Sequence, residues 1–172
     1  MIFWKKILLI AIVAGGCVGC DQVTKGIARE GLEVSRPISY FGDVVRLQYE
    51  ENHGGMLSFG ATLSDRSRFF LLTVFVAICL SMFFLYTLVS RSLHETQVMG
   101  ISLILGGGLS NLLDRLLNNG AVIDFLVLGL GSVRTAVFNF ADVAILTGVC
   151  ILLLNRSRRA PTDGFKQKVS TE

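Results

Sequence analysis

The 172-residue chain has few charged residues and almost no proline. Only 17% of its residues are Asp, Glu, Lys or Arg, where about 25% is usual in soluble domains, and two residues are Pro. Apolar side chains make up 52% of the chain, and the mean hydropathy is +0.61. This composition disfavours a disordered chain, a collagen-like chain and a nucleic-acid-binding protein with a basic face. We expect lipid to surround much of the protein.

The sequence is also poor in residues that bind metals or form disulfides. Its cysteines lie within apolar stretches, at Cys17, Cys20, Cys79 and Cys150, so a disulfide framework of the small secreted type is not expected. Cys17 and Cys20 form a CxxC without a second Cys or His pair nearby, which favours two small residues on a helix face over a redox or metal site. The two histidines, His53 and His94, are predicted on opposite sides of the membrane. They indicate neither a zinc site nor a Ser-His or Cys-His pair.

Three apolar runs are long enough to cross the hydrocarbon core of a membrane, which is about 30 Å thick. Residues 69–90 and 96–113 contain no charged residue, and residues 136–154 contain only Asp142. A helix rises about 1.5 Å per residue, so each run has a suitable length. Each run therefore predicts a transmembrane helix.

The N-terminal segment has two interpretations. An apolar run of 14 residues, 7–20, follows Lys5 and Lys6, and its small residues before cysteine imitate a lipoprotein cleavage site. We favour a retained first span over about 4–23, because residues 2–4 can lie at the interface while the lysines reach the aqueous phase. The alternative, a lipoprotein made by cleavage before one of the cysteines, leaves three further spans unexplained. The intact mass of the purified protein separates the two.

Four spans place both chain ends on one side of the membrane. Lys and Arg lie close to span ends at the N-terminal tip, in the 91–95 loop and in the tail, although each side carries eight of them in total. Because basic residues near span ends orient a membrane protein, we expect both termini in the cytoplasm. Residues 1–172 then form a single integral membrane domain, with spans at about 4–23, 69–90, 96–113 and 136–154, an extracytoplasmic segment at 24–68, an outer loop at 114–135 and a cytoplasmic tail at 155–172.

Two segments outside the spans have strand character. Residues 38–41 and 44–49 flank a Gly42-Asp43 turn and predict a small hairpin resting on the membrane surface. Residues 121–133 are too few to span the membrane and contain two glycines. They predict either a further strand or a re-entrant piece.

Polar residues that are costly in lipid gather near the predicted outer ends of the spans. A charged side chain at the centre of a membrane helix costs about 2.5–3.5 kcal/mol on insertion scales. Residues three or four apart share a helix face, and this spacing occurs in Asn111, Asp114 and Arg115 and again in Asn139 and Asp142. Simple interhelical hydrogen bonds, worth about 0.6–2 kcal/mol each, explain the asparagines equally well. Asp114 and Arg115 are as readily a structural ion pair as a catalytic one.

Asp124 and Asp142 differ from these residues because neither has an adjacent Lys or Arg. If the fold brings them together in a medium of low dielectric constant, they cannot both ionise easily and would share one proton. One ionised and one neutral carboxyl group form a general base and a general acid in one site. Such a pair can activate a water molecule and protonate a leaving amine.

Five short motifs stand at the predicted span boundaries. In chain order they are Asp21-Gln22-Val23-Thr24-Lys25, Asn52-His53-Gly54, Gly107-Gly108-Leu109-Ser110-Asn111-Leu112-Leu113-Asp114-Arg115, Val122-Ile123-Asp124-Phe125 and Phe138-Asn139-Phe140-Ala141-Asp142. Together, and in this order, they resemble the signal peptidase II family, the lipoprotein signal peptidases, which are aspartic peptidases of the bacterial inner membrane. The resemblance covers residues 20–154, and the combination is far more specific than any one motif.

The resemblance implies a mainly α membrane protein: a four-transmembrane-helix bundle with a small outward-facing β-cradle and a short surface helix. It implies cleavage of diacylglyceryl-modified prolipoproteins just before the lipidated Cys, with no metal and no organic cofactor. Asp124 and Asp142 match the catalytic pair. The positions that match substrate-holding or site-framing residues are Asp21, Lys25, Asn52, Gly54, Asn111, Arg115 and Asn139. We expect a monomer in contact with membrane lipid, in the bacterial cytoplasmic (inner) membrane, with its active site near the outer face and no nucleic-acid partner.

One motif departs from the family pattern. After Asn52 and Gly54 the family usually reads Ala-Ala-Phe, whereas this chain reads Gly55-Met56-Leu57-Ser58, which bears on substrate range and inhibitor sensitivity. A divergent paralogue with a narrow client set is therefore an alternative. A small non-enzymatic transporter or proton-conducting protein is another, but its sites would be expected at the midplane between inverted repeats, and the sequence shows neither.

Overall fold

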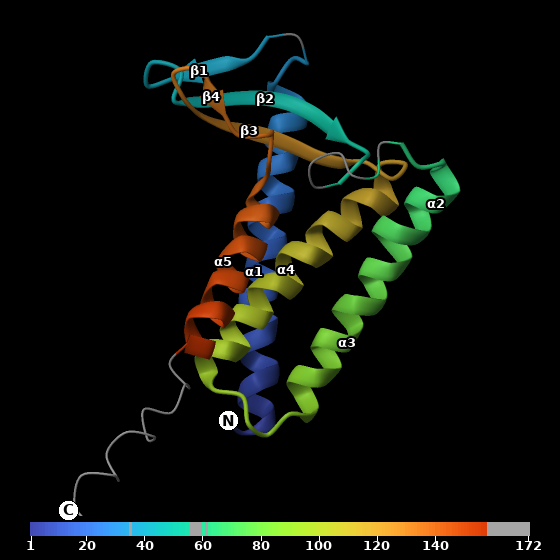
Figure 1. Cartoon of the computed structure of the whole chain (residues 1–172), viewed down its shortest axis with the longest axis vertical. Helices are drawn as coiled ribbons and strands as arrows, with labels where there is room; N and C mark the ends of the chain where they lie inside the picture. The colour runs from blue at the N-terminus through green and yellow to red at the C-terminus, as the bar shows by residue number, and fades with distance from the viewer. Residues whose placement is uncertain (35, 56–59, 61, 158–172) are drawn as a thin grey trace, which may run out of the picture.

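The computed structural model describes residues 1–34, 36–55, 60 and 62–157. Most of the predicted tail at 155–172 lies outside the described residues. Figure 1 shows long helices beneath a small sheet, while the N-terminus and the last turns of α5 (Phe140–Ser157) lie at the end away from the sheet. The predicted fold class, a membrane-type helical bundle with a small antiparallel sheet, is confirmed.

Among the described residues, three helical stretches are long and apolar enough to cross a membrane, and α5 adds a shorter apolar one, Phe140–Asn155. They are α1 (Phe3–Gly31), the continuous stretch of α2 (Asp65–Phe69), η2 (Phe70–Phe75) and α3 (Val76–Val89), and α4 (Glu95–Leu117). The short helix α2 begins at its N-cap Ser64, whose side chain accepts a hydrogen bond from the Ser67 N–H. The π-helical η2 joins α2 to the membrane helix without a break.

The first helix continues to Gly31, past the end of the predicted span near residue 23. Asp21 and Lys25 are one helical turn apart, and their charged groups are 2.6 Å apart. Both side chains are buried, with 0% and 1% of their surface exposed. The helix therefore buries a charge pair where the apolar run has already ended.

Helix α4 is the centre of the bundle and contacts α1, α3 and α5. Glycines allow its close approach to two of them. A Cβ at Gly106 would lie 2.9 Å from the Cα of Ala14 in α1, and a Cβ at Gly100 would lie 3.0 Å from the carbonyl oxygen of Gly148 in α5. Small residues let membrane helices approach closely, since packing rather than burial from water drives their association.

A second buried lysine lies at the end remote from the sheet. The Lys6 side chain of α1 is 2% exposed, and its ammonium donates to the carbonyls of Thr87, at 3.0 Å, and Ser90. These carbonyls belong to the end of α3, where the helix dipole favours a cation. Lys6 thus joins α1 to α3 far from the sheet.

The sheet contains four antiparallel strands in the order β1 (Ile38–Tyr40), β2 (Val45–Asn52), β3 (Val122–Leu130) and β4 (Val133–Arg134). The hairpin predicted over 38–49 is confirmed as β1 and β2, and the segment predicted at 121–133 is a strand rather than a re-entrant piece. Strand β2 pairs with β3 so that Asn52 lies opposite Val122. This pairing brings the second and fourth motifs of the sequence together.

We expect Gly107→Ala to lower the melting temperature of the protein in detergent. An added Cβ would lie 2.8 Å from Ile145 Cγ1 and even closer to the Ala141 carbonyl oxygen, and overpacking of this kind typically costs about 1–3 kcal/mol. Gly15→Ala is the control, because a Cβ at Gly15 meets nothing within 4 Å. Equal melting temperatures for the two variants would contradict close packing of α4 against α5.

Candidate active site

Asp124 and Asp142 come from different elements and meet at a group of asparagine side chains. Asp124 lies on β3, where its carboxylate accepts hydrogen bonds from Asn139 Nδ2 at 2.6 Å and from Asn52 Nδ2 at 2.9 Å. Asp142 lies in the first turn of α5, and its Oδ1 accepts from Asn111 Nδ2 at 3.0 Å. Neutral amide donors therefore surround both carboxyl groups.

The start of α5 fixes the position of Asp142. Asn139 precedes the helix, and its side-chain oxygen accepts a hydrogen bond from the Asp142 N–H at 2.9 Å. The Asp142 carboxylate accepts in return from the Asn139 N–H at 3.2 Å. This reciprocal pair is a capping box with the usual three-residue spacing. The spacing that predicted a shared helix face is therefore a helix cap, and the cap also orients a candidate catalytic carboxyl group.

Asn52 and Gly54 form the wall of the site at the end of β2. The Asn52 amide donates to Asp124, and its oxygen accepts from the Gly54 N–H at 3.1 Å. This second bond fixes which end of the amide faces Asp124. Gly55 follows with a φ of +71°, a backbone conformation that favours glycine. The other residues of the unusual motif, Met56, Leu57 and Ser58, lie outside the described residues.

Burial dominates the electrostatics of Asp124, whose side chain is 2% exposed. Loss of water, the largest influence, and the nearby charge of Asp142 raise the pKa of Asp124 from 3.8 to about 6. Hydrogen bonds from Asn52 and Asn139 and the charge of Lys25 act in the opposite direction, because they favour the ionised form. Asp124 therefore holds a proton to a higher pH than an ordinary carboxyl group.

Arg115 lies beside the carboxyl pair, within electrostatic reach of Asp142, Asp124 and Asp114. Its Nη1 donates to the Asn111 carbonyl at 3.4 Å, and its buried Nε has no hydrogen-bond partner among the described residues. Arg115 thus has a donor available for a bound molecule. The interpretation of Asp114 and Arg115 as an ion pair is not supported, because Asp114 pairs with Lys25 at 2.8 Å instead.

Asp21, Lys25 and Asp114 lie behind the site, where none is more than 2% exposed. Two further residues in this cluster were not identified from the sequence, although both stand within its motifs. Ser110 donates to Asp21 at 2.7 Å, and Gln22 donates to Asp114 at 2.9 Å. Spacing along one helix cannot reveal them, because each joins α1 to α4.

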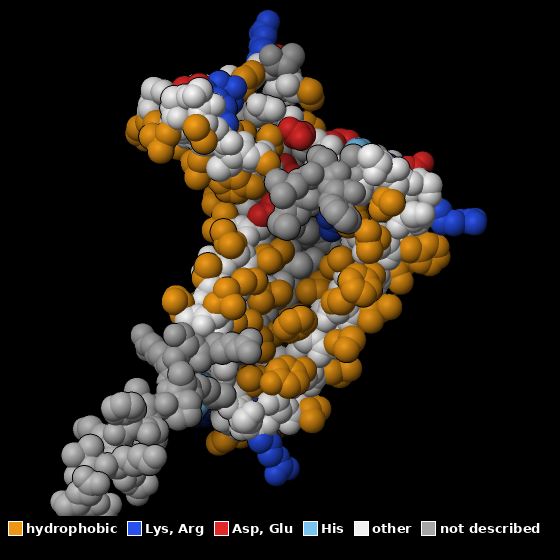
Figure 2. All heavy atoms as spheres, in the orientation of Figure 1, with side chains coloured by type: hydrophobic (Ala, Val, Ile, Leu, Met, Phe, Trp, Pro, Cys, Tyr) orange, Lys and Arg blue, Asp and Glu red, His pale blue; other side chains and the backbone are white. Residues whose placement is uncertain are grey.

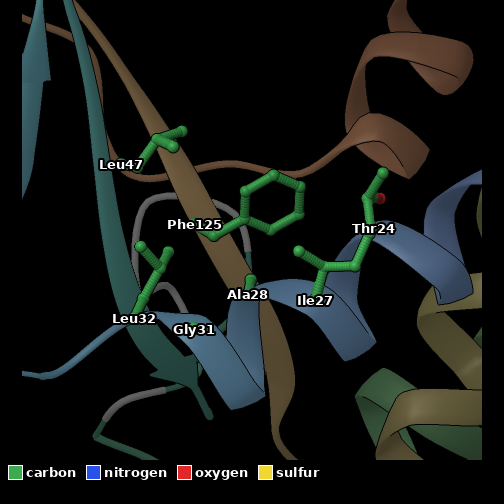
Figure 3. Close-up of a pocket in the computed structure, with 7 residues that line it drawn as sticks. All are labelled: Thr24, Ile27, Ala28, Gly31, Leu32, Leu47 and Phe125. Atoms are coloured by element: carbon green, nitrogen blue, oxygen red, sulfur yellow. The ribbon is translucent and has the colours of Figure 1, made fainter.

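Two cavities flank the site and differ in chemistry. One, of about 590 Å³, is lined by His53, Asp65, Arg68, Phe69, Leu72, Thr73, Arg115, Leu116, Asn119 and Gly120. The other, of about 240 Å³, lies between the end of α1 and the sheet, where Figure 3 shows the Phe125 ring above Ala28 and beside Ile27 and Thr24. Its lining contains no acid, base or metal ligand. The polar cavity, which reaches Arg115, is the better candidate for bound substrate.

The remaining candidate ligands are dispersed. His53 lines the polar cavity, whereas His94 lies at the start of α4, at the opposite end of that helix from Arg115. Within the described part of the chain, no group of three or more His, Cys, Asp or Glu side chains could hold a metal ion, and the four cysteines are free thiols. Figure 2 shows acidic side chains near the sheet and hydrophobic side chains over the helices below it.

The apolar helices, the sheet at one end and the carboxyl pair, of which Asp124 is buried, define a membrane protein with a candidate acid–base site. The family model described as signal peptidase (SPase) II matches residues 9–157. The chain therefore belongs to the signal peptidase II family, and the resemblance found in the sequence is confirmed. It is a peptidase of that family.

Similar proteins span the same length. The lipoprotein signal peptidase of Syntrophotalea carbinolica is 33% identical over 168 residues, which cover 96% of both chains. That of Treponema denticola is 34% identical over 96% of this chain and 94% of its own. A solved bacterial membrane enzyme, 24% identical, superimposes with a TM-score of 0.74 over 97% of this chain and 94% of its own. This last likeness supports the fold alone.

We expect Gly55→Ala to reduce cleavage of a prolipoprotein substrate about ten-fold or more. An alanine is strained at the positive φ of this position, and the backbone would relax by moving the segment next to Asn52 and Arg115. An added Cβ would meet Leu72 at 3.4 Å and Arg115 Nη2 at 3.8 Å. Gly42→Ala is the matched control: Gly42 also has a positive φ, +65°, but lies in the β1–β2 turn with nothing within 4 Å of its Cβ position. Each change costs about 1–2 kcal/mol in strain. Equal activities in the two variants would show that the conformation at Gly55 serves stability alone.

Proposed function

We propose that this chain is an intramembrane aspartic endopeptidase that removes the signal peptide from diacylglyceryl-modified prolipoproteins, just before the lipidated Cys. One observation carries the proposal: two carboxyl groups from distant segments share a site lined by amides, and burial raises the pKa of one of them, Asp124, to about 6. Perturbed carboxyl groups of this kind are typical of acid–base sites. Relatives named lipoprotein signal peptidases support the substrate class.

In the proposed reaction Asp142 is the general base and Asp124 the general acid. Asp142 is partly exposed, and hydrogen bonds from Asn111 Nδ2 and from the Asn139 N–H hold its carboxyl oxygens in the site. It takes a proton from water while the water oxygen attacks the scissile carbonyl carbon. The carbon–nitrogen bond then breaks, and Asp124 gives its proton to the leaving nitrogen. The products are the carboxylic acid of the signal peptide, which ionises in water, and the free amino group of the lipidated Cys. Asp142 is left protonated and Asp124 ionised, and proton exchange with water restores the pair for the next cycle.

Arg115 and the asparagines take part without exchanging protons. The Nε of Arg115, which has no hydrogen-bond partner among the residues that the structure describes, is a donor for a substrate carbonyl oxygen, on which negative charge develops during attack. Asn52, Asn111 and Asn139 keep both carboxyl groups in place. A substrate in the 590 Å³ cavity would lie against Arg115, which is within electrostatic reach of both carboxyl groups.

The protein is proposed to lie in the bacterial cytoplasmic (inner) membrane as a multi-pass monomer in contact with lipid. Basic residues near the N-terminal tip and in the tail favour a cytoplasmic location for both ends. The N-terminus and the end of α5 lie away from the sheet (Figure 1), so this orientation puts the sheet and the carboxyl pair near the outer face. A transporter or proton-conducting protein is not favoured, because the matching family and relatives are peptidases.

Asp124→Asn and Asp142→Asn are each expected to abolish cleavage of a diacylglyceryl-modified prolipoprotein, since an amide cannot exchange a proton. Loss of acid–base help costs on the order of 10²–10⁴ in rate, and the double variant should be no worse than either single one. Glu50→Gln is the control, because Glu50 is exposed on β2 and lies opposite Asp124 in the strand register.

The measurement is turnover by purified protein in detergent or lipid, alongside substrate retention and melting temperature. Retained substrate with lost turnover would identify a defect in chemistry. Loss of a general acid or base should lower turnover far more than about ten-fold. If either single variant keeps more than about a tenth of wild-type turnover, the aspartic mechanism at that residue is wrong.

The value of kcat/KM is expected to fall as the pH rises above about 6. Asp124 must be protonated to act as the acid, and its pKa of about 6 keeps the proton in place up to that pH. Above it, the protonated fraction falls about ten-fold per pH unit, and an ordinary carboxyl group would fail already near pH 4. Bound substrate excludes water, so the decline in kcat should lie at higher pH. A kcat/KM that stays constant up to about pH 9 would contradict this role for Asp124.

A further inference from the structure

The buried ammonium of Lys25 has three hydrogen-bond acceptors. They are Asp21 Oδ2 at 2.6 Å, Asp114 Oδ2 at 2.8 Å and Asn111 Oδ1 at 2.9 Å. An ammonium group has three donors, so this set saturates it. Because Lys25 is 1% exposed, it cannot contact a substrate. Any influence on the reaction must pass through its three partners.

Both carboxylates of this cluster also hold the backbone next to the proposed dyad. Asp21 Oδ1 accepts from the N–H of Ala141 at 2.8 Å, and Ala141 directly precedes Asp142. Asp114 Oδ2 accepts from the N–H of Ile123 at 3.0 Å, and Ile123 directly precedes Asp124. One buried cation is thus shared by two carboxylates, each of which fixes the residue before a dyad member. A cluster that only stabilised the bundle would not need hydrogen bonds to the residues directly before Asp124 and Asp142.

The third partner of Lys25 reaches the dyad directly. An ammonium group only donates, so the atom of Asn111 that faces Lys25 must be its oxygen. The Asn111 nitrogen then points at Asp142 Oδ1, at 3.0 Å. Asn139 Nδ2 supports the same orientation, at 3.2 Å from the Asn111 oxygen. A reversed amide would turn an oxygen toward the Asp142 carboxylate.

We propose that Lys25 is a positioning residue, which acts through Asp21, Asp114 and Asn111 to hold both proposed catalytic carboxyl groups in their reactive arrangement. This inference rests on the proposed function. It separates Asp21 and Lys25 from the residues that hold substrate, since both lie behind the site. Arg115 and Asn52 face the site itself.

The test is the charge-balanced double variant Lys25→Gln/Asp114→Asn. It removes one positive and one negative charge, so the net charge of the cluster is unchanged, and both new side chains can still form hydrogen bonds. Asp21 loses its ion pair but keeps the hydrogen bonds from Ser110 and from the Ala141 N–H. We expect kcat for a diacylglyceryl-modified prolipoprotein to fall about ten- to hundred-fold, because misplacement by about 1 Å has effects of this size. KM should stay within about three-fold of wild type, because neither residue contacts the substrate and ground-state binding is unaffected.

Lys6→Gln is the matched control, because Lys6 is the other buried lysine among the described residues and holds the end of α3. Its loss should lower the melting temperature while kcat and KM per folded molecule stay unchanged. If the double variant melts below the assay temperature, Asp21→Asn serves for the same comparison, since it leaves Lys25 paired with Asp114. A fall in kcat at constant KM in the folded variant supports the proposal.

A wild-type kcat in the folded Lys25 or Asp21 variant would overturn the proposal, and so would parallel losses in that variant and in Lys6→Gln. Wild-type protein and Asp124→Asn are assayed in the same series. If the wild type does not cleave the substrate, or Asp124→Asn does, then the proposed function fails instead. The two failures are therefore distinguishable.

Discussion

The structure depends on how one lysine ammonium is accommodated away from water. A buried charge is costly unless it is paired and hydrogen-bonded, and Lys25 has an acceptor for each of its three donors. Its partners come from α1 and α4, and two of them, Asp21 and Asp114, also accept hydrogen bonds from the backbone of α5 and β3. The cluster therefore lies where the bundle meets the sheet, and its pairing requires four elements to be in register.

The carboxyl pair lies next to this cluster, but its neighbours are neutral amides and not the charged groups that surround Lys25. Asn52, Asn111 and Asn139 contact it through neutral amides. Amides donate hydrogen bonds but do not titrate in the physiological range, so a proton in this site stays with the carboxyl groups. Burial raises the pKa of Asp124, whereas the amide donors and Lys25 oppose the rise. The balance leaves a group that can change its protonation near neutral pH, which a fully compensated carboxylate would not do.

The sequence predicted elements whose signals are local. Apolar runs predicted the helices, and the Gly42-Asp43 turn predicted the hairpin. The three-residue spacing of Asn139 and Asp142 predicted that the two residues lie together, although as a shared helix face and not as the helix cap that the structure has. The partner of Asp114 was not predicted, because Lys25 is distant in the chain and only packing of α1 against α4 brings the two together. The extension of α1 beyond residue 23 was missed for the same reason. A hydropathy run ends at its first charges, but a pair buried between helices permits the helix to continue.

The apolar contacts of α4 and α5 determine how accurately the polar site can be built. The two helices approach closely at Gly100 with Gly148 and again at Gly107 with Ala141, about two turns apart. Asn111 stands one turn beyond Gly107, at the level of the α5 cap, and donates to Asp142 at 3.0 Å. A hydrogen bond of this length weakens when its ends separate by a few tenths of an ångström. Because a methyl group has no room at the Gly107 contact, the absence of a side chain there sets the distance between the helices. That distance is short enough for Asn111 on α4 to hold a carboxyl group that belongs to α5.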